Sequence, residues 1–187
     1  MPSSETAAAR IAELLPEIND IRDPRLREQV VGCWLDALDG GGWSADDLSS
    51  IPASLRLVDR PFGLVEHVRG VAQMAQAACR VFRVLYGEGV IRLDPDVVLA
   101  GALLHDVGKP LEFVRRDGGW RLSEQARSFR HPFGGFAIAA RRQLPPPVLE
   151  IIAYHSTEGE SFPRSAEGTV IHLVDALNFT PFFAGRG

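Results

Sequence analysis

The sequence has little lysine, little cysteine and no long apolar run, and these shortages exclude several classes of protein. Its 187 residues carry a formal net charge of -4, so it lacks the basic excess of a general nucleic-acid binder. The longest apolar stretch, Val97 to Leu104, is far shorter than the roughly 18 to 20 residues that span a membrane. Residues 1–10 lack the apolar core of a signal peptide. We therefore expect a cytoplasmic protein with no membrane partner and no general affinity for nucleic acid.

Only two cysteines are present, Cys33 and Cys79. In a reducing compartment we expect both to be buried free thiols, whereas an oxidising compartment would allow them to pair. With 45% hydrophobic and 24% charged residues, the chain has the composition of a folded protein. Its length suits one domain of ordinary size.

Most of the chain has the apolar periodicity and the capping residues of α-helices. Residues 6–18 carry an apolar stripe with helical spacing. Asp23-Pro24 and Asp94-Pro95 each combine a capping carboxylate with a proline in the first turn, and they predict helices over 23–38 and 94–106. The other helices are expected at 64–86, 131–140, 145–155 and 167–179.

Three segments interrupt this helical pattern. The triglycine at 40–42 is a loop rather than a phosphate-binding loop, because no strand precedes it and no Gly-Lys-Ser follows it. Residues 43–60 are expected to be irregular, or to hold one short helix near Asp46. Residues 112–122 contain Asp117-Gly118-Gly119 between two short strand-like runs, which predicts a β-hairpin. We expect an all-α helical bundle with this small hairpin inserted after the helix that ends at the His-Asp pair.

The run from His105 to Lys109, His-Asp-Val-Gly-Lys, places two metal-ligating residue types side by side. Imidazole and carboxylate suit divalent Zn, Fe, Mn, Co or Ni. A lone pair of this kind is a weak indication, because a histidine on an apolar helix is more often a core residue. However, His67, His131, His155 and Asp175 lie in other predicted helices, with successive spacings of 20 to 38 residues. A helical bundle can bring such side chains together around a metal.

Lys109 is the single lysine in a chain with 19 arginines. It could simply place positive charge in the last turn of a helix, where the helix dipole favours a cation. Alternatively, it supplies a compact positive charge beside the metal ligands, of the kind that binds phosphate. We favour the second interpretation because arginine is used almost everywhere else.

Four histidines and two aspartates in this order resemble the metal-binding set of the HD-domain superfamily of metal-dependent phosphohydrolases. These residues are His67, His105, Asp106, His131, His155 and Asp175. The resemblance implies one metal ion on His67, His105, Asp106 and Asp175, and a second on His131 and His155, with Asp106 as the bridge. It therefore implies two divalent transition-metal ions, Fe or Mn before Co, Ni or Zn.

The resemblance extends over about residues 60–180 and sets the expected division of the chain. We predict a helical N-terminal lead-in at 1–58 that packs on the core, an HD metal-binding domain at 59–180, and a short tail at 181–187. The order of the motifs leaves the oligomeric state open.

The activity that the resemblance implies is hydrolysis of a small phosphomonoester or phosphodiester, with a nucleotide among the candidates. A hydroxide bridging the two metals would attack phosphorus, with Asp106 and Lys109 as catalytic residues. Arg127, Arg130 and Arg60 are candidates for binding substrate phosphate beside Lys109, although ordinary surface charge explains each equally well. His172 precedes Asp175 by one turn and could support the ligands or simply pack in the core.

Two alternative functions stay open. Some members of the superfamily are mixed-valent di-iron oxygenases that cleave C–C or C–P bonds; the phosphonate-cleaving ones carry Tyr and Glu where this chain has Leu57 and Arg60. The inositol-cleaving ones keep a lysine after the His-Asp pair, as this chain does with Lys109, so the oxygenase interpretation stays open. A non-catalytic sensor module that retains metal is the other alternative. Cyclic di-GMP hydrolysis is disfavoured, because Tyr154-His155-Ser156 and Ser161-Phe162-Pro163 stand where that branch has a doubled histidine and Gly-Tyr-Pro.

Overall fold

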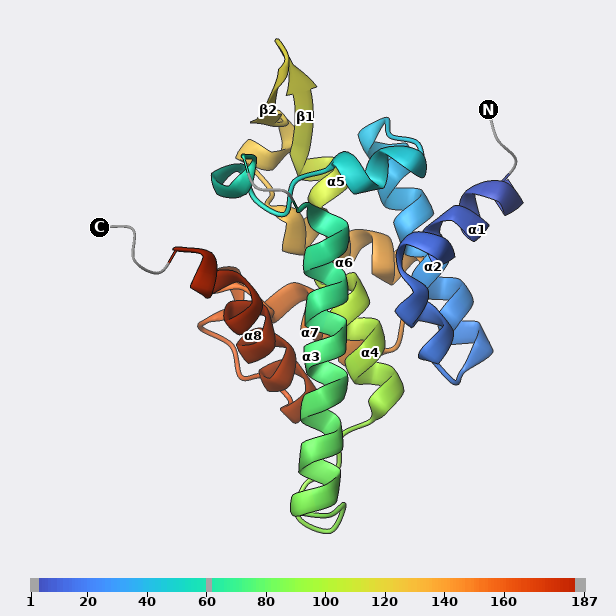
Figure 1. The fold of residues 1–187 in the computed structure, drawn as a ribbon, viewed down its shortest axis with the longest axis vertical. Helices are drawn as coiled ribbons and strands as arrows, with labels where there is room; N and C mark the ends of the chain where they lie inside the picture. Colours follow the sequence, from blue (N-terminus) through green and yellow to red (C-terminus); the bar gives the residue numbers. More distant parts are fainter. Residues whose placement is uncertain (1–3, 60–61, 184–187) are drawn as a thin grey trace.

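The chain folds into a bundle of α-helices with one β-hairpin (Figure 1), in a computed structural model that describes residues 4–59 and 62–183. The α-helices are α1 (Ser4–Leu14), α2 (Pro24–Gly41), α3 (Leu64–Leu85), α4 (Pro95–Leu104), α5 (Lys109–Glu112), α6 (His131–Arg141), α7 (Pro146–Tyr154) and α8 (Ala166–Phe179). The 3-10 helices are η1 (Pro16–Asp20), η2 (Asp46–Ser50), η3 (Leu55–Leu57), η4 (Gln125–Arg127), η5 (Thr157–Gly159) and η6 (Thr180–Phe183). The predicted all-α fold with a hairpin insertion is confirmed.

The helix predicted over 6–18 is divided in two. Helix α1 ends at Leu14, and η1 begins at Pro16. Proline lacks a backbone N–H and disfavours the α conformation of the preceding residue, and Leu15 accordingly has φ -123° and ψ 66°. The apolar stripe is nevertheless buried as its spacing indicated, since Ile11, Leu15 and Ile18 are at most 1% exposed.

Helix α4 is the centre of the bundle. Asp94 accepts hydrogen bonds from the backbone N–H groups of Asp96 and Val97 and so caps the helix, as predicted. From Val98 to Leu104 every residue of α4 is buried, and α4 contacts α2, α3, α7 and α8. Among the described residues, no helix combines the length and the apolarity that crossing a bilayer requires.

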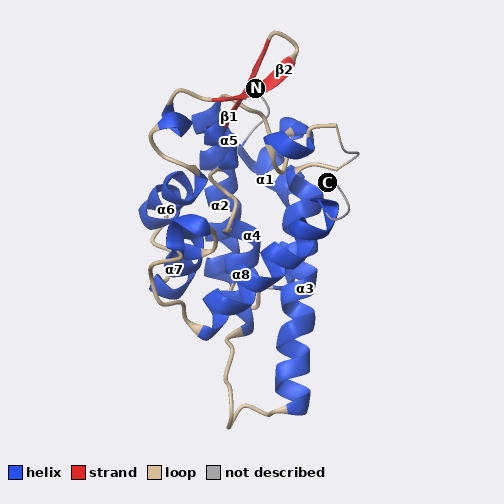
Figure 2. Cartoon of the chain, turned by 90° about the vertical axis from the view of Figure 1, so that its left-hand side faces the viewer, coloured by secondary structure: helices blue, strands red, loops and turns tan. Residues whose placement is uncertain are grey.

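The hairpin pairs β1 (Phe113–Arg116) with β2 (Gly119–Leu122) in antiparallel register. Its two-residue turn has positive φ at both Asp117 and Gly118, as a turn that follows the twist of two strands requires. The hairpin and the C-terminal end of α3 project from opposite ends of the molecule (Figures 1 and 2). The core that carries the histidines lies between these ends.

The segment before residue 58 packs against the later helices. Helix α2 contacts α4, α5 and α6. The indole Nε1 of Trp43 donates a hydrogen bond to the carbonyl of Pro110 at 2.9 Å, and its ring lies 5.3 Å from that of Trp120 on the hairpin. These contacts fix the N-terminal segment beside the turn that follows α4.

The two cysteines are free thiols in different surroundings. Cys33 on α2 is fully buried, as expected. Cys79 on α3 is only half-buried, which differs from the expectation. The second half of α3 extends toward the projecting end of the molecule, so fewer elements cover this part of the helix (Figure 1).

Candidate metal centre

The six predicted ligand residues converge in the core as two groups of three. One group is His67, His105 and Asp175, and the other is Asp106, His131 and His155. Within each group the candidate ligand atoms lie within 4.8 Å of one another. The residues come from α3, the turn after α4, the start of α6, the end of α7, and α8. Sequence segments far apart are therefore assembled into one cluster.

Asp106 joins the two groups. Its Oδ2 lies 3.2 Å from His67 Nε2 and 3.4 Å from His105 Nε2. Its Oδ1 lies 3.1 Å from His131 Nε2 and 3.7 Å from His155 Nε2. Each oxygen thus faces one pair of imidazoles, which is the arrangement that a bridging carboxylate needs.

The end of α4 explains how adjacent residues can serve one cluster. Side chains of neighbours on a regular helix diverge by about 100°, but α4 ends at Leu104 and a tight turn follows. Gly108 completes this turn against α6, where an added Cβ would lie 2.0 Å from the carbonyl oxygen of His131. Only a residue without a side chain allows this approach, so the turn and His131 are positioned together.

Each of the four clustered histidines has a hydrogen-bond acceptor at Nδ1. The pairs are His67 with Asn178 Oδ1 at 2.9 Å, His105 with the Ala102 carbonyl at 2.6 Å, His131 with Glu112 Oε2 at 2.6 Å, and His155 with the Ile152 carbonyl at 3.0 Å. These oxygens only accept, so each Nδ1 carries the proton and donates it. In the neutral rings the Nε2 lone pairs then face the cluster, as metal-ligating histidines require.

The candidate ligand atoms of the centre lie so close together that positive charge is needed among them. Nε2 of His67 lies 3.2 Å from Nε2 of His105, and the corresponding atoms of His131 and His155 are 3.4 Å apart. Lone pairs this close repel unless a cation lies among them. Asp106 Oδ2 is also buried, and although the Lys109 ammonium lies 2.7 Å from it, no hydrogen bond of good geometry reaches it among the described residues. Four imidazole nitrogens and two carboxylates fit two divalent transition-metal ions.

Protons occupy part of this role when no metal is bound. Burial opposes a charged His67, but the carboxylates of Asp106 and Asp175, each 3.2 Å from its Nε2, outweigh burial and raise its pKa to about 9. Burial likewise opposes ionised Asp175, yet the hydrogen bond from His67 brings its pKa down to about 2. The pKa of Asp106 lies well below its ordinary value despite burial, because Lys109 and the histidines favour the carboxylate. Metal binding would displace these protons.

Lys109 is a buried member of this cluster. Its Nζ lies 2.7 Å from Asp106 Oδ2 and donates a hydrogen bond to the carbonyl of Ala53. The residue begins α5 rather than ending α4, so it does not sit at the negative end of the α4 dipole. Its charge is directed at the carboxylate between the two groups, which favours the interpretation that relates Lys109 to the centre.

The predicted substrate arginines differ in placement. Arg130 is half exposed and donates from Nε to Glu112 Oε1 at 2.6 Å, so it contacts the residue that holds His131. The side chain of Arg127 is exposed and, in residues 4–59 and 62–183, forms no hydrogen bond or ion pair. Arg60 lies outside the described residues. His172 interacts through Nδ1 with the backbone carbonyl of His155 at 2.6 Å, so it supports that segment without facing the cluster.

Two supporting residues, Glu112 and Asn178, were not identified from the sequence. Each follows a candidate site residue by one helical turn: Glu112 comes three residues after Lys109, and Asn178 three residues after Asp175. Residues at this spacing share a helix face. The sequence interpretation instead placed Glu112 at the start of the hairpin, whereas it is the last residue of α5.

Comparisons with known proteins agree with this geometry. A family model described as the HD domain matches residues 64–179. A curated relative, the dihydroneopterin 2′,3′-cyclic phosphate phosphodiesterase of Methanocaldococcus jannaschii, is 30% identical over 114 residues. That alignment covers 60% of this chain and 45% of the relative, so the chain spans less than half of the relative's length. No solved structure matches significantly.

Proposed function

The chain belongs to the HD-domain family, and we propose that it is a metal-dependent phosphodiesterase that hydrolyses a small phosphate ester. The observation that carries this proposal is the joining of two three-residue groups by the buried carboxylate of Asp106. The phosphodiesterase activity named for the archaeal relative supports a phosphodiester rather than a monoester as substrate.

The residues of the centre would hold two metal ions, and we propose Fe or Mn before Co, Ni or Zn. His67, His105 and Asp175 would hold one ion, His131 and His155 the other, and Asp106 would contact both. When bound, such ions lower the pKa of water and polarise phosphoryl oxygens. The outward hydrogen bonds at the four Nδ1 atoms keep the Nε2 atoms directed inward before any ion arrives.

Lys109 would act on the charge of the phosphoryl group. Its ammonium is buried beside Asp106 and is held by the Ala53 carbonyl, so little reorganisation is needed when negative charge develops nearby. Substrate would approach from the side of α8. Asp175 is the one ligand candidate of the six that is not buried, with 22% of its side chain exposed.

Hydrolysis of a model phosphodiester tests the proposal directly. Protein depleted of metal and reloaded with Mn or Fe is assayed with bis(p-nitrophenyl) phosphate and with nucleoside 2′,3′-cyclic phosphates, in air and without oxygen. We expect metal-dependent turnover that survives removal of oxygen and is lost in Asp106→Ala. Asp39→Ala, at an exposed position on α2, is the matched control and should keep full activity.

Three results would contradict the proposal. Oxygen consumption with a phosphonate or polyol, without phosphodiester hydrolysis, would indicate the di-iron oxygenase activity. Bound metal without turnover on any phosphate ester would indicate a sensor module. Fewer than two metal ions per chain at saturation would contradict the assignment of His131 and His155.

A cytoplasmic location, predicted from the sequence, stays a prediction that fractionation of the source cells can test.

A further inference from the structure

The open side of the metal centre is bordered by a row of side chains on α8 and η6. Asp175 has the most exposed side chain of the six candidate ligands. Phe179 follows it by four residues, and Phe183 follows Phe179 by four. Side chains at this spacing lie on one face of a helix. The row therefore leads from the candidate ligands to the end of α8 and into η6.

Ring contacts show that this row is continuous. Phe179 lies edge-to-face against the imidazole of His67, with 6.1 Å between the ring centroids. The centroid of Phe183 lies 4.9 Å from that of Phe179. The guanidinium of Arg56, in η3, lies over the ring of Phe183 at 4.3 Å from its centroid. A candidate metal ligand, two aromatic rings and a cation thus follow one another within contact distance.

A second pair of rings ties η6 to the start of α3. The centroids of Phe62 and Phe182 lie 4.5 Å apart, and Phe62 comes directly before Gly63, the N-cap of α3. Because α3 carries His67 in its first turn, η6 is fixed to the element that supplies a candidate ligand. Phe62 and Phe182 therefore help to keep the row beside the centre.

These rings do not fill the hydrophobic core. Among the described residues that surround them, none of the four is covered enough to be buried, and Phe182 is 40% exposed. Leaving an aromatic ring in water forgoes the free energy that its burial would provide. Partly exposed rings beside the open side of a candidate active site are typical of a surface that a ligand covers.

Arg56 has hydrogen-bond donors that the protein leaves unused. Its side chain is exposed and, within residues 4–59 and 62–183, forms no hydrogen bond and no ion pair. Stacking on Phe183 uses the face of the guanidinium, whereas its N–H groups lie in the plane at its edge. These groups can donate to a carbonyl oxygen or a ring nitrogen of a ligand that lies along the row.

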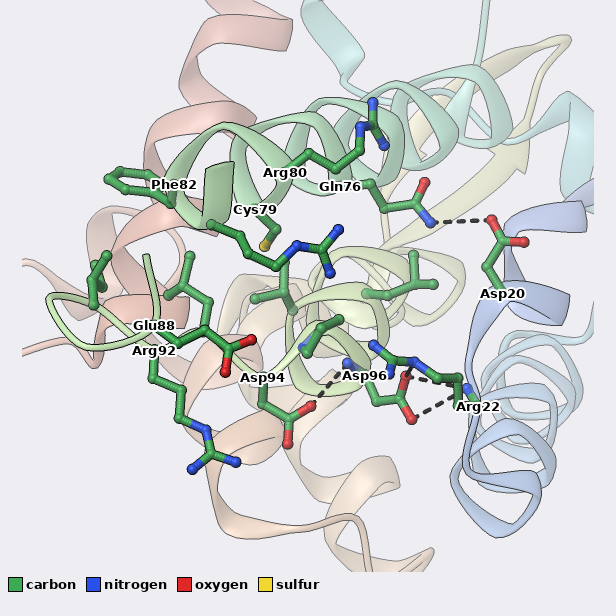
Figure 3. Close-up of a pocket in the computed structure, with 16 residues that line it drawn as sticks. Asp20, Arg22, Gln76, Cys79, Arg80, Phe82, Glu88, Arg92, Asp94 and Asp96 are labelled. Carbon is green, nitrogen blue, oxygen red and sulfur yellow. Dashed lines mark hydrogen bonds and ion pairs between the residues drawn. The ribbon is translucent and has the colours of Figure 1, made fainter. Parts of the chain in front are cut away.

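The pocket between the second half of α3 and the start of α4 does not serve the metal centre (Figure 3). Its volume is about 540 Å³, but none of the six candidate ligands lines it. Its lining residues on α3 begin at Gln76, nine residues and therefore about 14 Å along the helix from His67. Four arginines and four carboxylates line it, so their formal charges cancel. The organic group of a small substrate held at the centre must lie elsewhere.

We propose that Phe179, Phe183 and Arg56 form the subsite for the organic group of the substrate, and that this group is a planar ring with a hydrogen-bond acceptor on its edge. The inference rests on the proposed function, because it takes the phosphate of the substrate to lie at the metal ions. The ring would stack on Phe179 and extend toward Phe183. The guanidinium of Arg56 would then donate a hydrogen bond to the edge of the ring.

Calorimetric titration of the metal-loaded protein tests the subsite with two probes that differ in the ring. Adenosine 5′-monophosphate and ribose 5-phosphate share the sugar and the phosphate, and only the first carries a planar base. We expect wild type to bind adenosine 5′-monophosphate about tenfold more tightly, within the range that stacking of a base on an aromatic side chain provides. Release of inorganic phosphate is measured alongside, so that turnover is not mistaken for binding.

Two variants remove the two parts of the subsite. Phe179→Leu/Phe183→Leu keeps apolar side chains and loses the flat rings, so the preference for adenosine 5′-monophosphate should fall to about twofold. Arg56→Ala should weaken binding of adenosine 5′-monophosphate about fivefold and leave ribose 5-phosphate unchanged, because the guanidinium is directed at the ring and not at the phosphate. Arg56 is exposed, so its replacement tests the proposal even if the double variant does not fold.

Matched controls replace the same residue types elsewhere. Phe136→Leu changes a phenylalanine of α6 that is 42% exposed, and Arg25→Ala changes an exposed arginine of α2. Both should keep the preference of wild type for adenosine 5′-monophosphate.

The results separate the subsite from the proposed function. Equal affinity of wild type for the two probes would overturn the subsite. A preference that survives in both Phe179→Leu/Phe183→Leu and Arg56→Ala, or an equal loss of both probes in Arg56→Ala, would also overturn it. The expected pattern of binding in protein that hydrolyses no phosphodiester would support the subsite and contradict the proposed function.

Discussion

Glu112 holds His131 by two hydrogen bonds, one from the ring Nδ1 at 2.6 Å and one from the backbone N–H at 3.1 Å. Burial opposes an ionised Glu112, but the hydrogen bond from His131 and the nearby Arg130 keep its pKa below the ordinary value. A buried charged carboxylate thus fixes both the ring and the backbone of one candidate ligand. The last residue of α5 therefore sets the orientation of the first residue of α6.

Replacement of Glu112 by glutamine should weaken metal binding at His131. The neutral amide accepts a weaker hydrogen bond from Nδ1, and loss of such a supporting partner typically costs about 10 to 100-fold in metal affinity or activity. Titration of metal into metal-free protein, followed by the phosphodiester assay, measures both effects. Glu124→Gln, at an exposed position, should resemble wild type. Unchanged affinity in Glu112→Gln would mean that His131 does not need this carboxylate.

Lys109→Met should affect the protein differently with and without metal. Removing one partner of a buried ion pair costs about 3 to 5 kcal/mol, and here it leaves Asp106 without its nearby ammonium. Metal ions would replace part of the lost charge, so urea unfolding should show a smaller loss in metal-loaded protein. If Lys109 also stabilises developing phosphoryl charge, kcat should fall by about 10² to 10³. A kcat equal to that of wild type would contradict this role.

The metal-free protein should lose stability as the pH rises from 6.5 to about 9. The pKa of His67 is raised from 6.5 to about 9 in the folded state, so the folded protein binds this proton more tightly than the unfolded chain. Its contribution is complete below pH 6.5, is lost by about pH 9, and amounts to about 3 kcal/mol. His131, whose pKa is also raised, acts in the same direction.

Urea unfolding in the presence of a chelator, at several pH values across this window, measures the slope. His67→Gln removes the shifted group, so its stability should change less steeply with pH than that of wild type. Equal slopes in the two proteins would contradict the assignment. Because metal competes with these protons, metal affinity should rise over the same range.

Gly108→Ala should destabilise the protein and disturb the centre. A Cβ at this position would lie 2.0 Å from the His131 carbonyl oxygen and 2.7 Å from the Gly135 nitrogen. Both contacts are with backbone, so α6 must move, at a cost of about 1 to 3 kcal/mol or more. Gly89→Ala is the matched control, since nothing lies within 4 Å of its added Cβ. Thermal unfolding of the two variants decides the point, and equal melting temperatures would contradict the expectation.

The sequence predicted the helices well where their ends carry local signals. Asp23-Pro24 and Asp94-Pro95 mark the starts of α2 and α4 because a capping carboxylate and a first-turn proline act within a few residues. The boundary between α1 and η1 was predicted wrongly. Pro16 is a local sign of this boundary, but the helical spacing of the apolar residues continues across it. Periodicity reports which face is buried, and it does not report whether the backbone stays α-helical throughout.

The clustering of the six candidate ligands could be predicted because histidine is rare in this chain and the order of the residues is informative, whereas their supporting contacts could not. The partnership of Asn178 with His67 joins residues 111 positions apart, and nothing local in the sequence indicates it. The distinction between Arg130, bound to Glu112, and Arg127, exposed in η4, also depends on packing. Such pairings follow from how the helices assemble rather than from any one segment.

The hydrogen bond from Lys109 to the Ala53 carbonyl has a consequence for how the protein can be divided. The match to the HD-domain family model begins at residue 64, but the network around the cluster reaches back to residue 53. A fragment starting at residue 64 would retain all six candidate metal ligands and lose the carbonyl that accepts the hydrogen bond of the Lys109 ammonium. The segment that the family model matches is therefore shorter than the segment whose contacts complete the candidate site, and grafting only the matched segment onto another scaffold would omit the acceptor of Lys109.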